Sequence, residues 1–310
     1  MKVYRSVEAF EKGNKTFATI GTFDGVHIGH RTILTRIIQL AKSVEGESVL
    51  ISFYPHPRLV LFPENNPLKL LHTLEEKIAT LETLGLNKLL LIPFTKEFSR
   101  TPSKAFIRDV LVEGVGIHTI VIGYDHHFGK NRTGGIEELR SFSTAYDYKV
   151  EEIPAQSINE ANISSTKIRR ALESGEVDVA NTYLGYPYGF SGVVVHGEKQ
   201  GRELGYPTAN MEVDESTKLI PCDGVYLVRV FIQEQSYYGL MSIGKKPTMG
   251  EFERSQEVFI MEFSGDLYGQ KIRVEFIKYL RGEKKFKGVE ELITAMDQDK
   301  AKALEIINTL

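Results

Sequence analysis

The chain has 310 residues, a formal net charge of −3 and a hydrophobic content of 42%, values typical of a globular protein with room for two cores. No long basic run occurs, so we expect no nucleic-acid partner. The single cysteine, Cys222, excludes an internal disulfide and a cysteine-rich metal site, and we expect it to be structural. No apolar segment matches a membrane span or a signal peptide, so we expect a cytoplasmic protein without membrane contact.

The first half of the chain alternates short apolar runs with amphipathic segments. The apolar runs predict strands at 16–20, 48–53, 88–92, 119–122 and 149–153. The amphipathic segments predict helices at 31–44, 74–84, 102–113 and 136–146, with Gly85 and Gly114 just past two of their ends. This alternation predicts an α/β unit whose parallel sheet is covered on both faces and binds ligands at the carboxyl ends of its strands.

The turn at residues 20–30, between the first of these strands and its helix, is the strongest candidate site. Its glycines allow a sharp turn and a close approach of a ligand; they are Gly21, Gly25 and Gly29. The helix N-terminus and the side chains of His27 and His30 favour a phosphate, which protonated histidines would bind more strongly. Taken alone, the motif fits a βα turn with two surface histidines equally well. The dinucleotide pattern G-x-G-x-x-G is absent, and a zinc site would lack a third ligand.

Two later turns follow predicted strands and carry polar side chains. In the turn at 53–58, two prolines fix the backbone while His56 and Arg58 project. The turn at 123–129 contains adjacent histidines, and it is not a Walker loop because five residues separate its glycines. Since parallel strands end at one edge of a sheet, we expect both turns to lie near the turn at 20–30.

The segment at 163–172 predicts a helix that begins near Ser164 or Ser165, both good N-caps. Its first turns carry cations at the end where the helix dipole disfavours them; these are Lys167, Arg169 and Arg170. This placement favours a polyphosphate site over a solvated helix face.

The pattern changes near residue 185, which predicts domains at 1–184 and 185–310. Alternating residues predict strands at 193–196, 224–232, 237–243, 256–263 and 271–277, followed by a helix at 289–307. Antiparallel strands with one terminal helix predict a small β-barrel.

A second polar cluster lies in this predicted barrel. Thr208 and Asn210 alternate along the chain, so two neutral oxygens can face one side, as suits Mg²⁺ that shares phosphate oxygens. A polar loop with a proline turn is the alternative interpretation. Glu257 shares a predicted strand face with apolar residues 259, 261 and 263, and the loss of water there favours a general base. The competing interpretations are that Glu257 lies at the wet end of the strand or that Glu262 is the important carboxylate.

The ordered motifs resemble the bifunctional riboflavin kinase/FAD synthetase family of bacteria over nearly the whole chain. The motifs are GTFDGVHIGH, FYPHP, GYDHHFG, SSTKIR, GRELGYPTAN, Pro247-Thr248, Glu257, GDLYG and RGEKKF. The resemblance implies a Rossmann-like nucleotidylyltransferase domain that joins FMN to the AMP part of ATP, giving FAD and pyrophosphate. It also implies an antiparallel β-barrel riboflavin kinase domain that uses MgATP.

The resemblance also implies roles for residues. His27 and His30 would hold the ATP phosphates, with Ser165, Thr166 and Arg169 as a clamp on the triphosphate. Thr208 and Asn210 would bind Mg²⁺ and phosphate, and Glu257 would take the proton of the riboflavin hydroxyl. Asp125 and Phe128 would help to hold the flavin. The remaining motif positions expected to contact nucleotide or flavin are Gly21, Phe23, Asp24, Gly25, Gly29, Phe53, His56, Pro57, Gly201, Arg202, Gly205, Pro207 and Arg281.

The expected small molecules are riboflavin, FMN and ATP, with flavoproteins as recipients of FAD. The chain departs from the family pattern at Val258-Phe259, where Thr-His is common, and at His126, where Phe is common. A monofunctional enzyme with one inactive module and a non-catalytic flavin-binding regulator are the alternatives. Both sets of candidate residues are present, which favours two activities.

Overall fold

The computed structural model describes residues 1–64, 68–124, 127–130, 133–154, 163–197, 205–213, 215–245 and 254–310. It divides the chain into two compact units, Met1–Ser165 and Thr166–Leu310. The domain boundary expected at 184/185 stays a prediction. No helix in the described ranges combines the length and the apolar character that a membrane span requires.

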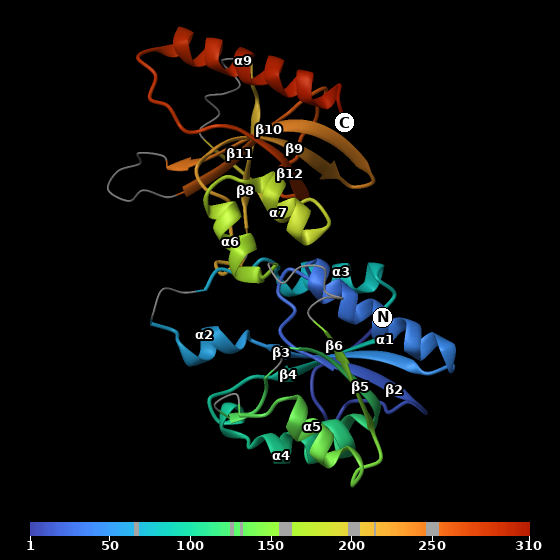
Figure 1. Ribbon diagram of the computed structural model, residues 1–310. Helices are drawn as coiled ribbons and strands as arrows, with labels where there is room; N and C mark the ends of the chain where they lie inside the picture. Colours follow the sequence, from blue (N-terminus) through green and yellow to red (C-terminus); the bar gives the residue numbers. More distant parts are fainter. Residues whose placement is uncertain are drawn as a thin grey trace. The chain divides into compact units, whose positions relative to one another are not determined.

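The first unit is built on a parallel sheet of six strands, in the order β1-β4-β3-β2-β5-β6 (Figure 1). The strands are β1 Lys2–Tyr4, β2 Thr16–Ile20, β3 Glu47–Tyr54, β4 Lys88–Pro93, β5 Ile117–Gly123 and β6 Lys149–Ile153. The chain moves outward from β2 through β3 to β4 and then returns to β5 on the other side of β2. The strand order therefore reverses between β2 and β5, and an α/β sheet binds its ligands outside such a point.

Helices cover both faces of this sheet, as predicted. On one face α1 (Ile28–Ser43) and α3 (Leu74–Thr83) pack on an apolar cluster; on the other lie η2 (Phe106–Val115) and α5 (Ile136–Ser143). The shorter helices of the unit are α2 Pro57–Leu61, η1 Phe98–Arg100 and α4 Ser103–Ala105. The expected core of apolar strands is confirmed, since every residue of β2 is buried.

The bounds of all four helices predicted in the first half of the chain differ from the prediction, and two of the differences involve glycines. The first helix begins at Ile28, so Gly29 lies inside it and does not shape the turn. The helix expected to end before Gly114 continues as the π-helix η2 to Val115, and Gly116, with a φ of 68°, ends it. Within that helix, position 114 requires a glycine because Val7 packs where a side chain would be, with an ideal Cβ only 2.3 Å from Val7 Cγ1.

The second unit contains a closed antiparallel barrel in the order β10-β11-β8-β7-β12-β9. Its elements are α6 Ser165–Glu173, which starts at the last residue of the first unit, α7 Val177–Leu184, β7 Gly189–Val195, β8 Thr208–Glu212, β9 Gly224–Ile232, β10 Gln235–Lys245, β11 Arg254–Ile260, β12 Lys271–Arg281 and α9 Val289–Ile307. The predicted barrel with a terminal helix is confirmed, and α9 lies along the outside of the barrel (Figure 1).

Every strand of the barrel except β9 differs from the prediction: β8 was not predicted, β10 and β12 are longer than expected, and β7 and β11 have shifted bounds. β7 begins at Gly189, before the predicted strand start at 193. β11 ends at Ile260 and not at Phe263, because Glu262 has a left-handed backbone with a φ of 57°. Of the three apolar residues predicted to share the strand face of Glu257, only Phe259 lies in β11, although Met261 joins the same apolar cluster as Phe259.

Candidate active sites

The turn after β2 has an unusual backbone. Gly21 and Gly25 have φ values of 157° and 79°, and the non-glycine residues Phe23 and Val26 have φ values of 46° and 36°. A positive φ costs free energy for residues with a side chain and persists where the surrounding structure enforces it. Such strain is common at ligand sites, and here it lies at the carboxyl end of β2, beside the reversal of strand order.

Buried polar contacts hold this turn in place. The carboxylate of Asp24 accepts hydrogen bonds from the backbone N–H groups of Leu71, at 3.0 and 3.1 Å, and His72, at 3.2 Å. Lys77 Nζ donates to the carbonyl oxygen of Thr22 at 2.6 Å. Asp24, expected to contact the ligand, thus uses its carboxylate to fasten the turn to the start of α3.

The hydroxyl of Ser165 also reaches this turn. Its Oγ donates to the backbone oxygen of Asp24 at 3.0 Å, so the structure brings this predicted clamp residue to the turn at 20–30. Thr166 and Arg169 follow in α6 and belong to the second compact unit, so their part in the clamp stays a prediction.

The two histidines lie at the start of α1. His27 is the N-cap: its Nδ1 accepts a hydrogen bond from the backbone N–H of His30 at 3.4 Å. The proton of a neutral His27 ring is therefore on Nε2, which leaves that nitrogen as the donor. The two rings are stacked, with centroids 3.6 Å apart and an angle of 17°, and the Phe23 ring lies 4.6 Å from that of His30.

The surroundings of His30 keep its ring neutral. Burial lowers its pKa well below the usual value, and the nearby His27, Lys77 and His72 lower it further. Its Nδ1 is buried and has no hydrogen-bond partner within the described part of the chain. An unsatisfied buried nitrogen is costly unless a ligand completes it. The protonated form that we expected to bind phosphate best thus requires an arriving anion to raise this pKa.

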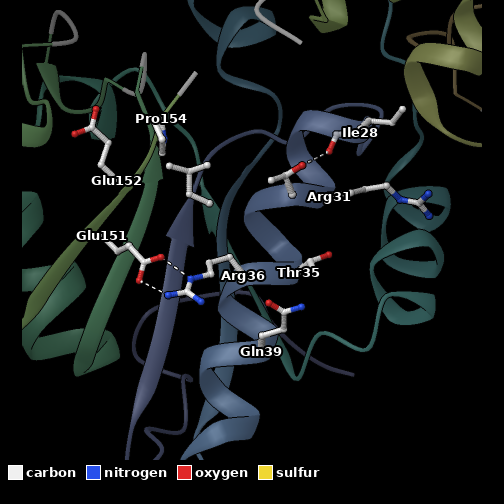
Figure 2. Close-up of a pocket in the computed structure, with 10 residues that line it drawn as sticks. Ile28, Arg31, Thr35, Arg36, Gln39, Glu151, Glu152 and Pro154 are labelled. Atoms are coloured by element: carbon white, nitrogen blue, oxygen red, sulfur yellow. Dashed lines mark hydrogen bonds and ion pairs between the residues drawn. The ribbon is translucent and has the colours of Figure 1, made fainter. Parts of the chain in front are cut away.

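A groove of about 530 Å³ runs from the start of α1 along the gap between α1 and β6 (Figure 2). Its lining is Ile28, Arg31, Thr32, Thr35, Arg36, Gln39, Glu151, Glu152, Ile153 and Pro154. Arg36 spans it and binds the carboxylate of Glu151 with two hydrogen bonds, of 2.5 and 3.1 Å. No local pattern in the sequence predicts this groove, because its two walls lie more than a hundred residues apart along the chain.

Aromatic rings gather near the carboxyl ends of β3 and β4. Phe53 lies 5.7 to 6.5 Å, between centroids, from Phe94, Phe98 and Phe106. Phe128 is buried and packs on Phe106, with centroids 5.7 Å apart. Of these rings only Phe53 and Phe128 were predicted site residues. Phe94 lies two residues after the predicted strand at 88–92, and that position was a usable signal.

The turn at 53–58 has a local structural role as well. His56 is the N-cap of α2, with Nδ1 accepting from the N–H of Arg58 at 3.2 Å, and Pro57 is the first helical residue. Helix capping therefore explains why a histidine stands between the two prolines, a placement that we had interpreted as functional.

The second cluster is set by the pairing of β8 and β11. Asn210 lies opposite Glu257, and Thr208 lies opposite Phe259, so all four share one face of the barrel wall. Thr208 Oγ1 donates to Glu257 Oε2 at 3.0 Å. The amide of Asn210 lies over Gly197, where an ideal Cβ would be 2.1 Å from Nδ2. Glu257 is half-buried, whereas Glu262 is exposed beyond the end of β11.

One predicted residue, Arg281, and one that was not predicted, Tyr206, contact acidic residues of α9. The guanidinium of Arg281 binds the carboxylate of Asp299 with nitrogen–oxygen distances of 2.8 to 3.0 Å. Tyr206, between Gly205 and Pro207, donates to Asp297; burial, followed by this hydrogen bond, raises its pKa to about 12. The Arg281 side chain, predicted to contact a ligand, is therefore already paired within the protein.

The remaining predicted positions are less informative. Gly205 has a φ of 79°, which requires a glycine at this turn. Asp125, Gly201, Arg202 and the Pro247-Thr248 turn lie outside the described residues.

The chain matches two family models. Residues 9–167 match the model described as FAD synthetase, and residues 184–307 match the one described as riboflavin kinase. Bifunctional riboflavin kinase/FMN adenylyltransferases are similar over most of the chain: the protein of Listeria monocytogenes is 36% identical over 287 residues, covering 92% of this chain and 90% of its own. That of Bacillus subtilis is 34% identical over 305 residues, covering 97% and 95%.

A solved structure shares the whole fold. A Streptococcus pneumoniae protein described as a macrolide-efflux protein superposes with a TM-score of 0.88 and 29% sequence identity, covering 96% of this chain and 97% of its own.

Proposed function

The chain belongs to the family of bifunctional riboflavin kinases/FMN adenylyltransferases, and we propose that the two clusters described above are its two active sites. The protein is an enzyme that phosphorylates riboflavin to FMN and adenylylates FMN to FAD. One observation carries the assignment of the sites: each unit holds its own cluster suited to phosphate. In the first it is the start of α1 with two stacked histidines; in the second it is a carboxylate beside neutral oxygens.

In the adenylyl transfer, a phosphate oxygen of FMN forms a bond to the α-phosphorus of ATP while the bond to pyrophosphate breaks. The nucleophile is already an anion, so the site needs no strong base and acts by orientation and charge stabilisation. The backbone N–H groups at the start of α1 and the rings of His27 and His30 bind the phosphate oxygens. Ser165, whose hydroxyl reaches this turn, helps to hold the triphosphate, and the family motif extends this role to Thr166 and Arg169.

The surroundings of this turn suit the rest of the two substrates. The groove beside α1 starts at Ile28, next to His27, and its size fits one nucleoside. The apolar side chains of Ile28 and Ile153 provide faces on which a flat base packs. On the other side, Phe53 and the rings around it provide a surface for the flavin, with Asp125 and Phe128 as further contacts.

In the kinase reaction, Glu257 accepts the proton of the ribityl 5′-hydroxyl as that oxygen attacks the γ-phosphorus of ATP. Thr208 and Asn210 hold Mg²⁺ and phosphate. These residues fit this ion, because the hydroxyl of Thr208 lies 3.0 Å from the Glu257 carboxylate and Asn210 is directly opposite in register, a set of hard oxygen donors. When bound, Mg²⁺ neutralises charge on the phosphates.

We further propose that the enzyme works in the cytoplasm, where ATP is available, and that flavoproteins receive its FAD. Nothing in this assignment requires a nucleic acid or a membrane.

Incubation with riboflavin, ATP and Mg²⁺ tests the proposal, with flavins separated by chromatography over time. FMN should appear first and FAD should follow. FMN supplied in place of riboflavin, with the same ATP and Mg²⁺, should also give FAD. A chain that formed FMN but no FAD from added FMN would contradict the assignment of the turn at 20–30. A chain that consumed no riboflavin would contradict that of Glu257.

A further inference from the structure

We propose that Lys77 is a positioning residue of the adenylyl-transfer site: its buried ammonium fixes the turn at residues 21–25 and places a positive charge beneath the phosphates bound there. The inference rests on the proposed function of that turn. Lys77 lies in the first half of α3, more than fifty residues after the turn, and no sequence motif includes it.

The contacts of Lys77 join the elements that meet at this edge of the sheet. Its Nζ donates to the backbone oxygen of Thr22 at 2.6 Å and to Ser52 Oγ, near the end of β3, also at 2.6 Å. The side chain is buried, with 8% of the residue exposed. In the opposite direction Asp24 of the turn accepts N–H groups just before α3. The turn and α3 are thus fastened to each other at two points, one through a lysine and one through a carboxylate.

A buried ammonium is costly, and its position suggests why it is kept. Burial lowers the pKa of Lys77 to about 8, an effect that the nearby Asp24 opposes. An uncharged side chain with one hydrogen-bond donor could fill this space at a lower cost in desolvation free energy. The charge of Lys77 is also one cause of the low pKa of His30, beside the ring of His27 and that of His72. The ammonium therefore acts on the group that we place at the phosphates.

A second buried lysine provides a matched control. Lys88 begins β4, at the opposite edge of the same sheet, and 5% of it is exposed. Its Nζ donates to the backbone oxygen of Glu11 at 2.7 Å and to Glu47 Oε2 at 2.6 Å. Lys88 resembles Lys77 in burial and in donating to one backbone oxygen and one side chain, here a carboxylate, and none of these contacts involves the turn at 20–30. Loss of either lysine affects stability, and only loss of Lys77 should affect adenylyl transfer.

The test compares Lys77→Met, Lys77→Arg and Lys88→Met, with FAD formation from FMN and ATP and the kinase reaction measured on the same samples. Lys77→Met should raise the KM for ATP about tenfold, as expected for the loss of one charged contact, with kcat changed less than about threefold. Lys77→Arg should recover most of this loss. Lys88→Met should leave the KM for ATP unchanged, and kinase turnover should be unchanged in all three.

The pH dependence of the KM for ATP distinguishes an electrostatic role of Lys77 from a purely structural one. In the wild type the KM for ATP should rise above about pH 8 as Lys77 loses its proton, given its pKa of about 8. Lys77→Met should lack this rise, and Lys77→Arg should lack it as well while keeping the low KM, because arginine stays charged. Equal effects of Lys77→Met and Lys88→Met on FAD formation, or an unchanged pH profile, would overturn the proposal. Absence of FAD formation in the wild type would instead overturn the proposed function. If Lys77→Met does not fold, the Lys77→Arg profile alone decides the matter.

Discussion

The two proposed active sites use different parts of the protein. In the first unit the turn after β2 supplies a strained backbone, a helix end and two stacked imidazoles. In the barrel the register between β8 and β11 supplies the site, since it sets Glu257 opposite Asn210 and beside Thr208. The difference follows the chemistry. The nucleophile of adenylyl transfer is already ionised and needs stabilised charge, whereas a riboflavin hydroxyl must lose a proton.

The largest effect that this comparison predicts is that of Glu257→Gln on the kinase reaction. Loss of a general base costs about 10²- to 10⁴-fold in rate, so FMN formation from riboflavin should nearly cease. FAD formation from added FMN should continue at the wild-type rate. The measurement is the initial rate of each reaction by chromatography of the flavins.

Glu262→Gln is the matched control for this substitution. Glu262 lies just past the end of β11, is exposed and makes no contact with Thr208 that the structure shows. Its replacement should leave both reactions unchanged. If the kinase reaction were lost in Glu262→Gln and kept in Glu257→Gln, the assignment of the base would be wrong.

The next largest effect is that of His30→Ala on FAD formation. Removal of one preorganised donor to developing charge costs about 10²- to 10³-fold in kcat. FMN should therefore accumulate from riboflavin while FAD formation is greatly reduced. His118→Ala is the control, because His118 lies near the start of β5, at the other edge of the sheet, where its ring packs on Phe17. Equal loss of FMN and FAD in His30→Ala would mean that the two sites are not separate.

Local patterns were sufficient to predict most of the architecture. β2, β6, β9 and α9 have the predicted bounds, because buried strands and an amphipathic helix leave periodic patterns in sequence. The turn at 20–30 was recognisable for a similar reason: glycines, histidines and a helix start are neighbours along the chain. The end of the π-helix was not predictable, since Gly114 resembled a helix stop, whereas it is a glycine because Val7, more than a hundred residues earlier in sequence, packs against it.

The contacts that were not predicted from the sequence join residues that lie far apart along the chain. Lys77 reaches Thr22 across 55 positions, and the groove pairs α1 with β6. Arg281 as a ligand contact stays a prediction, and its pairing with Asp299, 18 residues later, was not predicted. No periodicity records such pairs, because each partner alone looks like an ordinary surface charge. The fold was therefore easier to predict than the way the site is held together.

The ion pair of Arg281 and Asp299 gives a third prediction, which concerns stability. Asp299→Asn removes charged hydrogen bonds from an arginine of which 18% of the side chain is exposed, and should lower the free energy of unfolding of the barrel by about 1.5–3 kcal/mol. The exposed pair of Lys278 and Asp178, with side chains 46% and 53% exposed, is the control. Asp178→Asn should cost about 1 kcal/mol or less. Urea unfolding followed by circular dichroism measures both, and equal losses would show that α9 is not fastened through Arg281.

The smallest predicted effect concerns acid stability of the first unit. Because the pKa of His30 is lowered in the folded state, the unfolded chain binds a proton there more readily. The stabilisation is present above about pH 6.5, the value of an ordinary histidine, and is lost as pH falls below it, by at most about 1.4 kcal/mol per pH unit. Urea unfolding at pH 7 and pH 5.5 should show a smaller loss in His30→Gln than in the wild type. Saturating ATP should also reduce the loss, since phosphate beside His30 raises its pKa. If ATP left the pH dependence of the unfolding free energy unchanged, His30 would not face the phosphates. The first unit could then not be contrasted with the barrel as a site that stabilises charge.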